Sequence, residues 1–159
     1  MSTQIAFVGC SHIHVQGFTN MVKQVQGITV KYAWDPEIER AQKWGAQVGA
    51  EVVTDLKVIA KDPDIKAVVI TSKTVEHAEL VKMFAKAGKD MFVEKPLGMS
   101  AEDAAQFLAQ AGLQLADVAD SGEQVIINSA GLENAAELVK VSLSQNLGQI
   151  KTNFYFDAR

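Results

Sequence analysis

The chain has 159 residues, of which 48% are hydrophobic and 21% charged, and a formal net charge of −4. This length fits about one domain with a core large enough to fold without disulfides. The negative charge gives no electrostatic basis for binding nucleic acid or an anionic membrane. One cysteine excludes an intrachain disulfide, and no apolar run is long enough to cross a bilayer. We therefore expect a cytoplasmic protein with neither nucleic acid nor membrane as a partner.

Short apolar runs alternate with amphipathic helical patterns along most of the chain. The runs predict strands at residues 5–8, 28–34, 51–54, 67–71, 90–94 and 125–128. Helices are predicted between them, with Asp35, Asp55, Thr74 and Ser100 as their N-terminal caps. Strands and helices that alternate in this way form βαβ units with right-handed crossovers. The prediction is an α/β fold, a doubly wound, mainly parallel sheet flanked by helices with strand order 3-2-1-4-5-6.

The loop after the first predicted strand has a partial phosphate-binding pattern. It runs Gly9-Cys10-Ser11-His12-Ile13-His14 and keeps only the first glycine of the dinucleotide fingerprint G-x-G-x-x-G. Free backbone N–H groups near His12 and Ile13, at the start of a helix, would attract a phosphate, and the Ser11 hydroxyl would add a hydrogen bond. The alternative is a plain turn from strand to helix.

Asp35, at the end of the second strand, supports a dinucleotide. A carboxylate there hydrogen-bonds the adenosine ribose hydroxyls and repels a 2′-phosphate. Because Pro36 and Glu37 follow, with no basic residue immediately after the aspartate, the pattern favours NAD over NADP. The alternative role is that of a helix cap, and one residue can serve both purposes.

His12 and His14 raise the question of a metal. Two residues apart at a helix start, their side chains are expected to point to different faces, and no carboxylate or thiolate has matching spacing. No metal site is predicted. Cys10 lies where a helix N-terminus can lower a thiol pKa, but a small residue lining the turn is the preferred interpretation.

The sequence Glu94-Lys95-Pro96-Leu97-Gly98, after a helix that ends in Ala87-Gly88-Lys89, resembles the glucose–fructose oxidoreductase/inositol dehydrogenase (Gfo/Idh/MocA) family. Ser72-Lys73-Thr74-Val75-Glu76-His77 is similar to that family's Thr-Pro-Asn-x-x-His stretch, with lysine in place of proline. The resemblance runs from residue 5 to residue 150 and covers the family's N-terminal, Rossmann-type NAD(P)-binding domain. Two fingerprint glycines and the basic residues that follow the sixth strand in many relatives are absent.

The resemblance implies a role for each matching residue. Gly9, Ser11, His12 and Ile13 would hold the pyrophosphate of NAD, and Asp35 the adenosine ribose. Ser72, Thr74 and His77 would line the nicotinamide-side ribose, and Glu94 would contact the nicotinamide end. Lys95 would be the catalytic lysine, which hydrogen-bonds the substrate hydroxyl and joins the proton relay as hydride moves to the cofactor.

The resemblance also implies two domains. Residues 1–148 would form the cofactor domain, and residues 149–159 would begin a C-terminal α/β substrate domain that is otherwise absent. Residues 150–157 alternate like a strand with one wet face, and its unpaired edge is expected either to associate with a second copy, giving a homo-oligomer, or to be poorly ordered.

The predicted function is the cofactor-binding domain of an NAD(P)-dependent dehydrogenase that transfers hydride to or from a sugar, polyol or related alcohol. NAD is the expected cofactor, and NADP is less favoured. One alternative is a non-catalytic NAD(P)-binding regulatory or sensor module, which the degenerate glycine loop favours. Another is a methyltransferase-like domain, for which the Glu94-Lys95-Pro96 turn would have no purpose.

Overall fold

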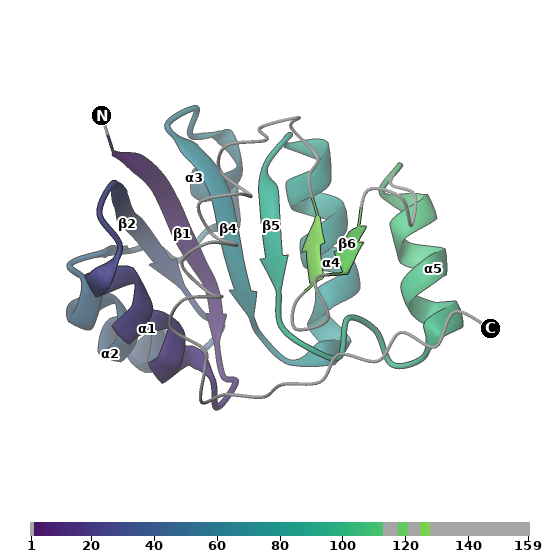
Figure 1. Cartoon of the computed structure of the whole chain (residues 1–159), viewed down its shortest axis with the longest axis horizontal. Helices are drawn as coiled ribbons and strands as arrows, with labels where there is room; N and C mark the ends of the chain where they lie inside the picture. The colour runs from purple at the N-terminus through teal and green to yellow at the C-terminus, as the bar shows by residue number, and fades with distance from the viewer. Residues whose placement is uncertain (1, 113–117, 121–124, 128–159) are drawn as a thin grey trace.

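The computed structural model describes residues 2–112, 118–120 and 125–127, which form one twisted sheet with helices on both faces (Figure 1). The strands are β1 (Thr3–Cys10), β2 (Ile28–Trp34), β3 (Glu51–Val52), β4 (Ile65–Thr71), β5 (Asp90–Val93), β6 (Val118–Asp120) and β7 (Val125–Ile127). The helices are α1 (Val15–Gln24), α2 (Ile38–Val48), α3 (Leu56–Lys61), α4 (Thr74–Lys86) and α5 (Ala101–Gln110).

The sheet order is β3-β2-β1-β4-β5-β7-β6. The first five strands pair in parallel, as predicted, and the predicted sixth strand, β7, lies beside β5 as expected. Its orientation was not predicted, because β7 is antiparallel to both β5 and β6. The additional strand β6 explains this. Only four residues lie between the last residue of β6 and the first residue of β7, and so short a connection joins antiparallel neighbours rather than parallel ones.

The central strands are buried on both faces, which is why their sequences are continuous apolar runs. In β1, Ala6 and Val8 pack into the core under α3, α4 and α5, while Ile5 and Phe7 pack into the core under α1 and α2. The alternating residues of β4 divide between the same two cores, as predicted for a strand with both faces covered. Figure 1 shows α1 and α2 on the near side of the sheet at β1 and β2.

The helix caps are partly as predicted. The Asp55 carboxylate accepts from the Lys57 N–H at 2.9 Å, and the Ser100 hydroxyl accepts from the Asp103 N–H at 3.1 Å. The prediction that Asp35 caps α2 is wrong, since this helix begins at Ile38 with Glu37 as its cap.

Thr74 is the first helical residue of α4 rather than its cap. Lys73 occupies the cap position, and its backbone N–H donates to the Glu76 carboxylate at 3.2 Å. The N-terminal cap of α4 therefore lies one residue earlier than predicted.

The predicted strand at 150–157 and the domain boundary between residues 148 and 149 lie outside the described residues. Among the helices that the structure describes, none has the length and apolar character needed to cross a membrane.

Candidate functional site

The predicted site residues gather at the carboxyl ends of four adjacent strands. Gly9 lies in β1, Asp35 follows β2, Ser72 follows β4, and Glu94 follows β5. Because β1 has β2 on one side and β4 on the other, the strand order reverses at β1 and β4. Open α/β sheets bind their ligands beyond the carboxyl ends at this reversal. The residues predicted to form the site therefore lie at the edge of the sheet where folds of this class bind their ligands.

Gly9 lets the ends of β1 and β4 approach closely. Its φ is +75°, and a Cβ built there would lie 2.4 Å from the Cβ of Ser72 and 2.6 Å from its Cα. The first fingerprint glycine is thus required by strand packing as well as by the turn.

The backbone of the first loop differs from the prediction. The N–H groups of Ser11 and His12 both donate to the Thr71 carbonyl, at 3.1 and 3.0 Å, so the prediction of a free N–H at His12 is wrong. For the exposed Ile13, no hydrogen bond of the N–H is found within the described part of the chain. Phosphate binding by this loop would rely on Ile13 N–H and the Ser11 hydroxyl.

Asp35 is buried and its carboxylate is extensively hydrogen-bonded. One oxygen, Oδ2, accepts from the Cys10 N–H at 2.6 Å, and Oδ1 accepts from the Glu37 N–H at 2.8 Å and from Arg40 Nε at 3.0 Å. A carboxylate has about four acceptor positions, so about one remains for a ribose hydroxyl. Arg40, which the sequence analysis overlooked, also pairs with Glu37 at 2.8 Å. Asp35 therefore ties the first loop to the start of α2.

Cys10 is buried beside Asp35. Burial, and then the negative charge of Asp35, raise the pKa of its thiol to about 12. The structure thus favours the packing role over a reactive thiol.

We expect Cys10 to react at pH 8 with a thiol reagent at least about 100-fold more slowly in the folded protein than in urea, because the thiolate is the reactive form. The reaction is slower in the folded protein because the pKa of the Cys10 thiol is raised, and the thiolate becomes populated only as the pH approaches about 12. Absorbance on mixing with a chromogenic disulfide measures both rates. Equal rates in folded and unfolded protein would contradict the buried, protonated thiol.

His12 and His14 point toward the same carboxylate, contrary to the prediction that they point apart. Their Nδ1 atoms lie 3.5 and 3.2 Å from Oε2 of Glu94, and the two rings meet edge to face at 4.7 Å. Burial lowers the pKa of His12 although the charge of Glu94 opposes this. The second carboxylate oxygen of the buried Glu94 accepts from the Lys95 N–H at 2.9 Å. Glu94 thus joins the first loop to the end of β5.

His77 lies buried in the first turns of α4. Its Nδ1 is 3.0 Å from the Leu97 carbonyl and donates to it, which leaves Nε2 as an acceptor. That Nε2 is buried and has no hydrogen-bond partner among the described residues, and burial lowers the pKa of the ring. Buried acceptors without a partner are uncommon, and each one needs an explanation such as a catalytic role or a bound water or ion. Ser72 is buried and Thr74 half-buried in the turn that leads into the same helix.

Lys95 is half-buried in the turn between β5 and α5. The turn is anchored on both sides of the lysine. Glu94 holds its N–H, and Gly98 lies so close to α5 that a Cβ there would come 2.9 Å from the Ala104 nitrogen. The lysine side chain therefore projects from a fixed backbone.

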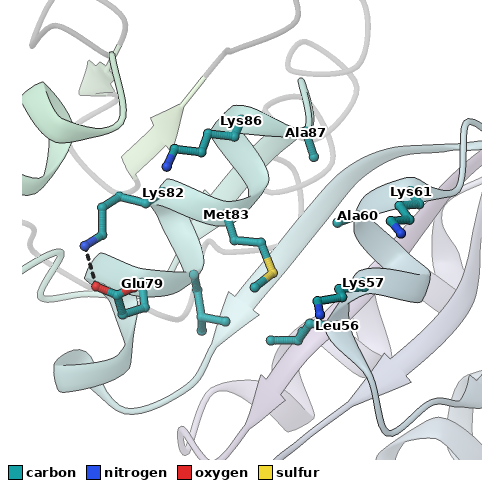
Figure 2. A pocket seen from close by; sticks show the side chains of 10 residues that line it. Leu56, Lys57, Ala60, Lys61, Glu79, Lys82, Met83, Lys86 and Ala87 are labelled. Atoms are coloured by element: carbon teal, nitrogen blue, oxygen red, sulfur yellow. Dashed lines mark hydrogen bonds and ion pairs between the residues drawn. The ribbon is translucent and has the colours of Figure 1, made fainter.

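A separate groove of about 640 Å³ lies between α3 and α4 (Figure 2). Leu56, Ala60, Leu80 and Met83 give it an apolar lining. Lysines flank it from both helices, and one of them, Lys82, pairs with Glu79. None of the residues predicted to bind a cofactor lines this groove.

Residues 3–115 match the family model described as "Oxidoreductase family, NAD-binding Rossmann fold". The chain is 32% identical over 99 residues to scyllo-inositol 2-dehydrogenase (NAD(+)) of Bacillus subtilis, a match that covers 62% of this chain and 29% of the relative. It is 34% identical over 100 residues to inositol 2-dehydrogenase/D-chiro-inositol 3-dehydrogenase of Lactiplantibacillus plantarum, covering 62% and 27%. The chain thus corresponds to about a third of the length of these relatives.

Solved structures agree with these matches. A myo-inositol dehydrogenase from Corynebacterium glutamicum superposes with a TM-score of 0.61 at 26% identity, over 70% of this chain and 33% of that one. A 3-ketoreductase from Actinomadura kijaniata in complex with NADP and TDP-benzene has the same fold, with a TM-score of 0.61 at 23% identity over 71% and 36%. The chain belongs to the oxidoreductase family with the NAD-binding Rossmann fold, and residues 3–115 correspond to the NAD-binding domain of that family.

Proposed function

We propose that this domain serves an NAD-dependent dehydrogenase that exchanges hydride between NAD and a sugar, polyol or related alcohol. The observation that carries the proposal is the arrangement of polar groups around the strand reversal. Asp35 lies beyond β2 on one side, while Ser72, His77, Glu94 and Lys95 lie beyond β4 and β5 on the other. Polar groups on both sides of the strand reversal suit the two ends of a dinucleotide that binds across it. The named inositol dehydrogenase relatives support an alcohol substrate.

The described residues fit the cofactor chiefly through His77. Its buried Nε2 needs a donor, and a ribose hydroxyl or the nicotinamide amide would supply one. Asp35 would accept from the adenosine ribose, and Gly9, Ser11, His12 and Ile13 would surround the pyrophosphate. Ser72 and Thr74 would line the nicotinamide-side ribose, with Glu94 at the nicotinamide end. When bound, NAD supplies the hydride acceptor.

Lys95 would act on the substrate rather than on the cofactor. An ammonium group donates hydrogen bonds and can exchange a proton, so it would hold the oxygen of the alcohol and take part in moving its proton. Glu94 assists by fixing the lysine backbone through the 2.9 Å hydrogen bond. The rest of the substrate pocket would come from a second domain, which we propose begins at residue 149.

We expect this chain to bind NADH and a Lys95→Ala variant to bind it within about threefold of the same affinity, because the lysine serves the substrate. In a protein that also carries the substrate domain, the same change should lower kcat by about 10²- to 10⁴-fold, the usual contribution of a general acid or base. Calorimetric titration with NADH measures the binding, and NADH absorbance measures the turnover.

Lys73→Ala is the matched control, since Lys73 is an exposed lysine in the neighbouring turn. It should keep both affinity and kcat. Absence of NADH binding at millimolar concentration by the unaltered chain would refute the cofactor proposal, and an unchanged kcat in Lys95→Ala would refute the catalytic role.

The comparisons do not favour the sensor alternative, because the relatives are named as dehydrogenases. A methyltransferase-like domain is excluded by the family to which the chain belongs. We further propose a cytoplasmic location, supported by the single buried cysteine. A homo-oligomer is proposed from the amphipathic pattern of residues 150–157.

A further inference from the structure

Three potential metal ligands converge from two distant segments. His12 and His14 come from the loop after β1, and Glu94 follows β5, 80 residues beyond His14. One potential ligand atom from each of the three side chains lies within 4.8 Å of the other two. Two imidazoles and one carboxylate form a recurrent donor set for zinc and for non-haem iron(II).

The contact between His12 and Glu94 brings together two hydrogen-bond acceptors with no proton between them. The His14 backbone N–H lies 3.3 Å from His12 Nδ1 and donates to it, so this nitrogen carries no proton, and an ion would replace this long hydrogen bond at its single lone pair. The same nitrogen lies 3.5 Å from Oε2 of Glu94, which also presents a lone pair. These two acceptor atoms, one of them on a buried carboxylate, repel each other unless a cation or a proton lies between them.

Two of the three ligand separations are close to those around a coordinated ion. Two ligands at about 2.0–2.1 Å from zinc, separated by the tetrahedral angle, lie about 3.3–3.4 Å apart. The observed separations from Glu94 Oε2 are 3.5 Å to His12 and 3.2 Å to His14, while the three ligand atoms as a set span up to 4.8 Å, so one imidazole would turn toward the ion on binding. We propose that His12, His14 and Glu94 bind one divalent transition-metal ion through Nδ1, Nδ1 and Oε2.

The surroundings hold these ligands and leave room for another. The Lys95 N–H fixes the second oxygen of Glu94, the kind of outer hydrogen bond that orients a ligating carboxylate. The His12 and His14 side chains are 25% and 20% exposed, so water or a ligand oxygen can complete the coordination.

The proposal does not depend on dinucleotide binding, because all three ligands belong to this chain. Its position is nevertheless informative, since the first loop is where the pyrophosphate would lie. An ion there would present positive charge to a phosphate or to another ligand oxygen. This would compensate for the loop N–H groups that are already engaged by Thr71.

Metal titration of the chelator-treated chain tests the site directly. We expect one equivalent of Zn²⁺ to bind in calorimetry, and Co²⁺ to bind with the visible absorption bands of a four-coordinate site. His12→Gln, His14→Gln and Glu94→Gln should each weaken zinc binding by at least the 10- to 100-fold that loss of an outer-shell partner costs. Circular dichroism confirms that each variant folds, and the two histidine variants suffice if Glu94→Gln does not.

Glu79→Gln serves as the matched control, because Glu79 is an exposed carboxylate on α4 that lies outside the proposed site. It should keep the zinc affinity. No binding of Zn²⁺ at submillimolar concentration, or equal affinity in the ligand variants and the control variant, would overturn the site and leave only a hydrogen bond between His14 and Glu94. NADH titration in the presence of chelator separates this result from failure of the cofactor proposal.

Discussion

Replacing Gly9 with alanine is expected to lower the free energy of unfolding by about 2–6 kcal/mol. A non-glycine residue at a positive φ costs about 1–3 kcal/mol, and overpacking a dense interior adds about 1–3 kcal/mol. Both costs apply to Gly9, since its φ is +75° and the new Cβ would lie 2.6 Å from the Cα of Ser72 and 2.8 Å from the Ser72 nitrogen. These are backbone atoms of the β4 end, which cannot rotate away. Urea denaturation monitored by tryptophan fluorescence measures the loss.

Gly27→Ala is the matched control. Gly27 has a φ of +85°, but a Cβ there would have no atom within 4 Å. This variant carries the conformational strain without the overlap, so it should lose about 1–3 kcal/mol and remain more stable than Gly9→Ala. Equal losses would show that the close approach of β1 to β4 relaxes easily, and that strand packing does not require the glycine.

The core of the fold was predictable because burial leaves a clear pattern in the sequence. The parallel strands β1, β2, β4 and β5 are short runs of apolar residues, and their order follows from the geometry of βαβ units. The edge of the sheet formed by β7 and β6 was less predictable. β6 has only three residues, and no apolar run marks it. The antiparallel direction of β7 depends on that unpredicted strand.

The candidate site was predictable where it depends on strand ends, and less so where it depends on contacts between distant segments. The pattern of Gly9, Asp35 and Glu94 indicated the edge formed by the carboxyl ends of the strands, and the structure places all three residues there. Local spacing gave no sign that Glu94 would meet His12 and His14, because the contact forms only when β1 and β5 enter one sheet with β4 between them. A search for carboxylates at other strand ends, rather than near the histidines in sequence, would have found it.

Asp35→Ser is expected to weaken NADH binding by about 10- to 100-fold while changing NADPH binding much less. The loss follows from removing a hydrogen bond to a charged acceptor, which is worth about 1.5–3 kcal/mol. NADPH gains in compensation, because Arg40 Nε now bonds to Asp35 and would become free to pair with a 2′-phosphate. The ratio of the two dissociation constants, measured by calorimetry, should move toward NADPH by at least about tenfold.

Adding Arg40→Ala to Asp35→Ser tests the source of that shift. The double variant should lose the NADPH gain and keep the NADH loss, since no guanidinium remains to meet the phosphate. Asp35 also braces the first loop through the Cys10 N–H, so a purely structural role must be distinguished. Disruption of the loop would weaken NADH and NADPH equally and would not depend on Arg40. An equal loss would therefore assign Asp35 to the architecture of the β1 and β2 ends, and a shifted ratio would place its remaining acceptor position at the adenosine ribose.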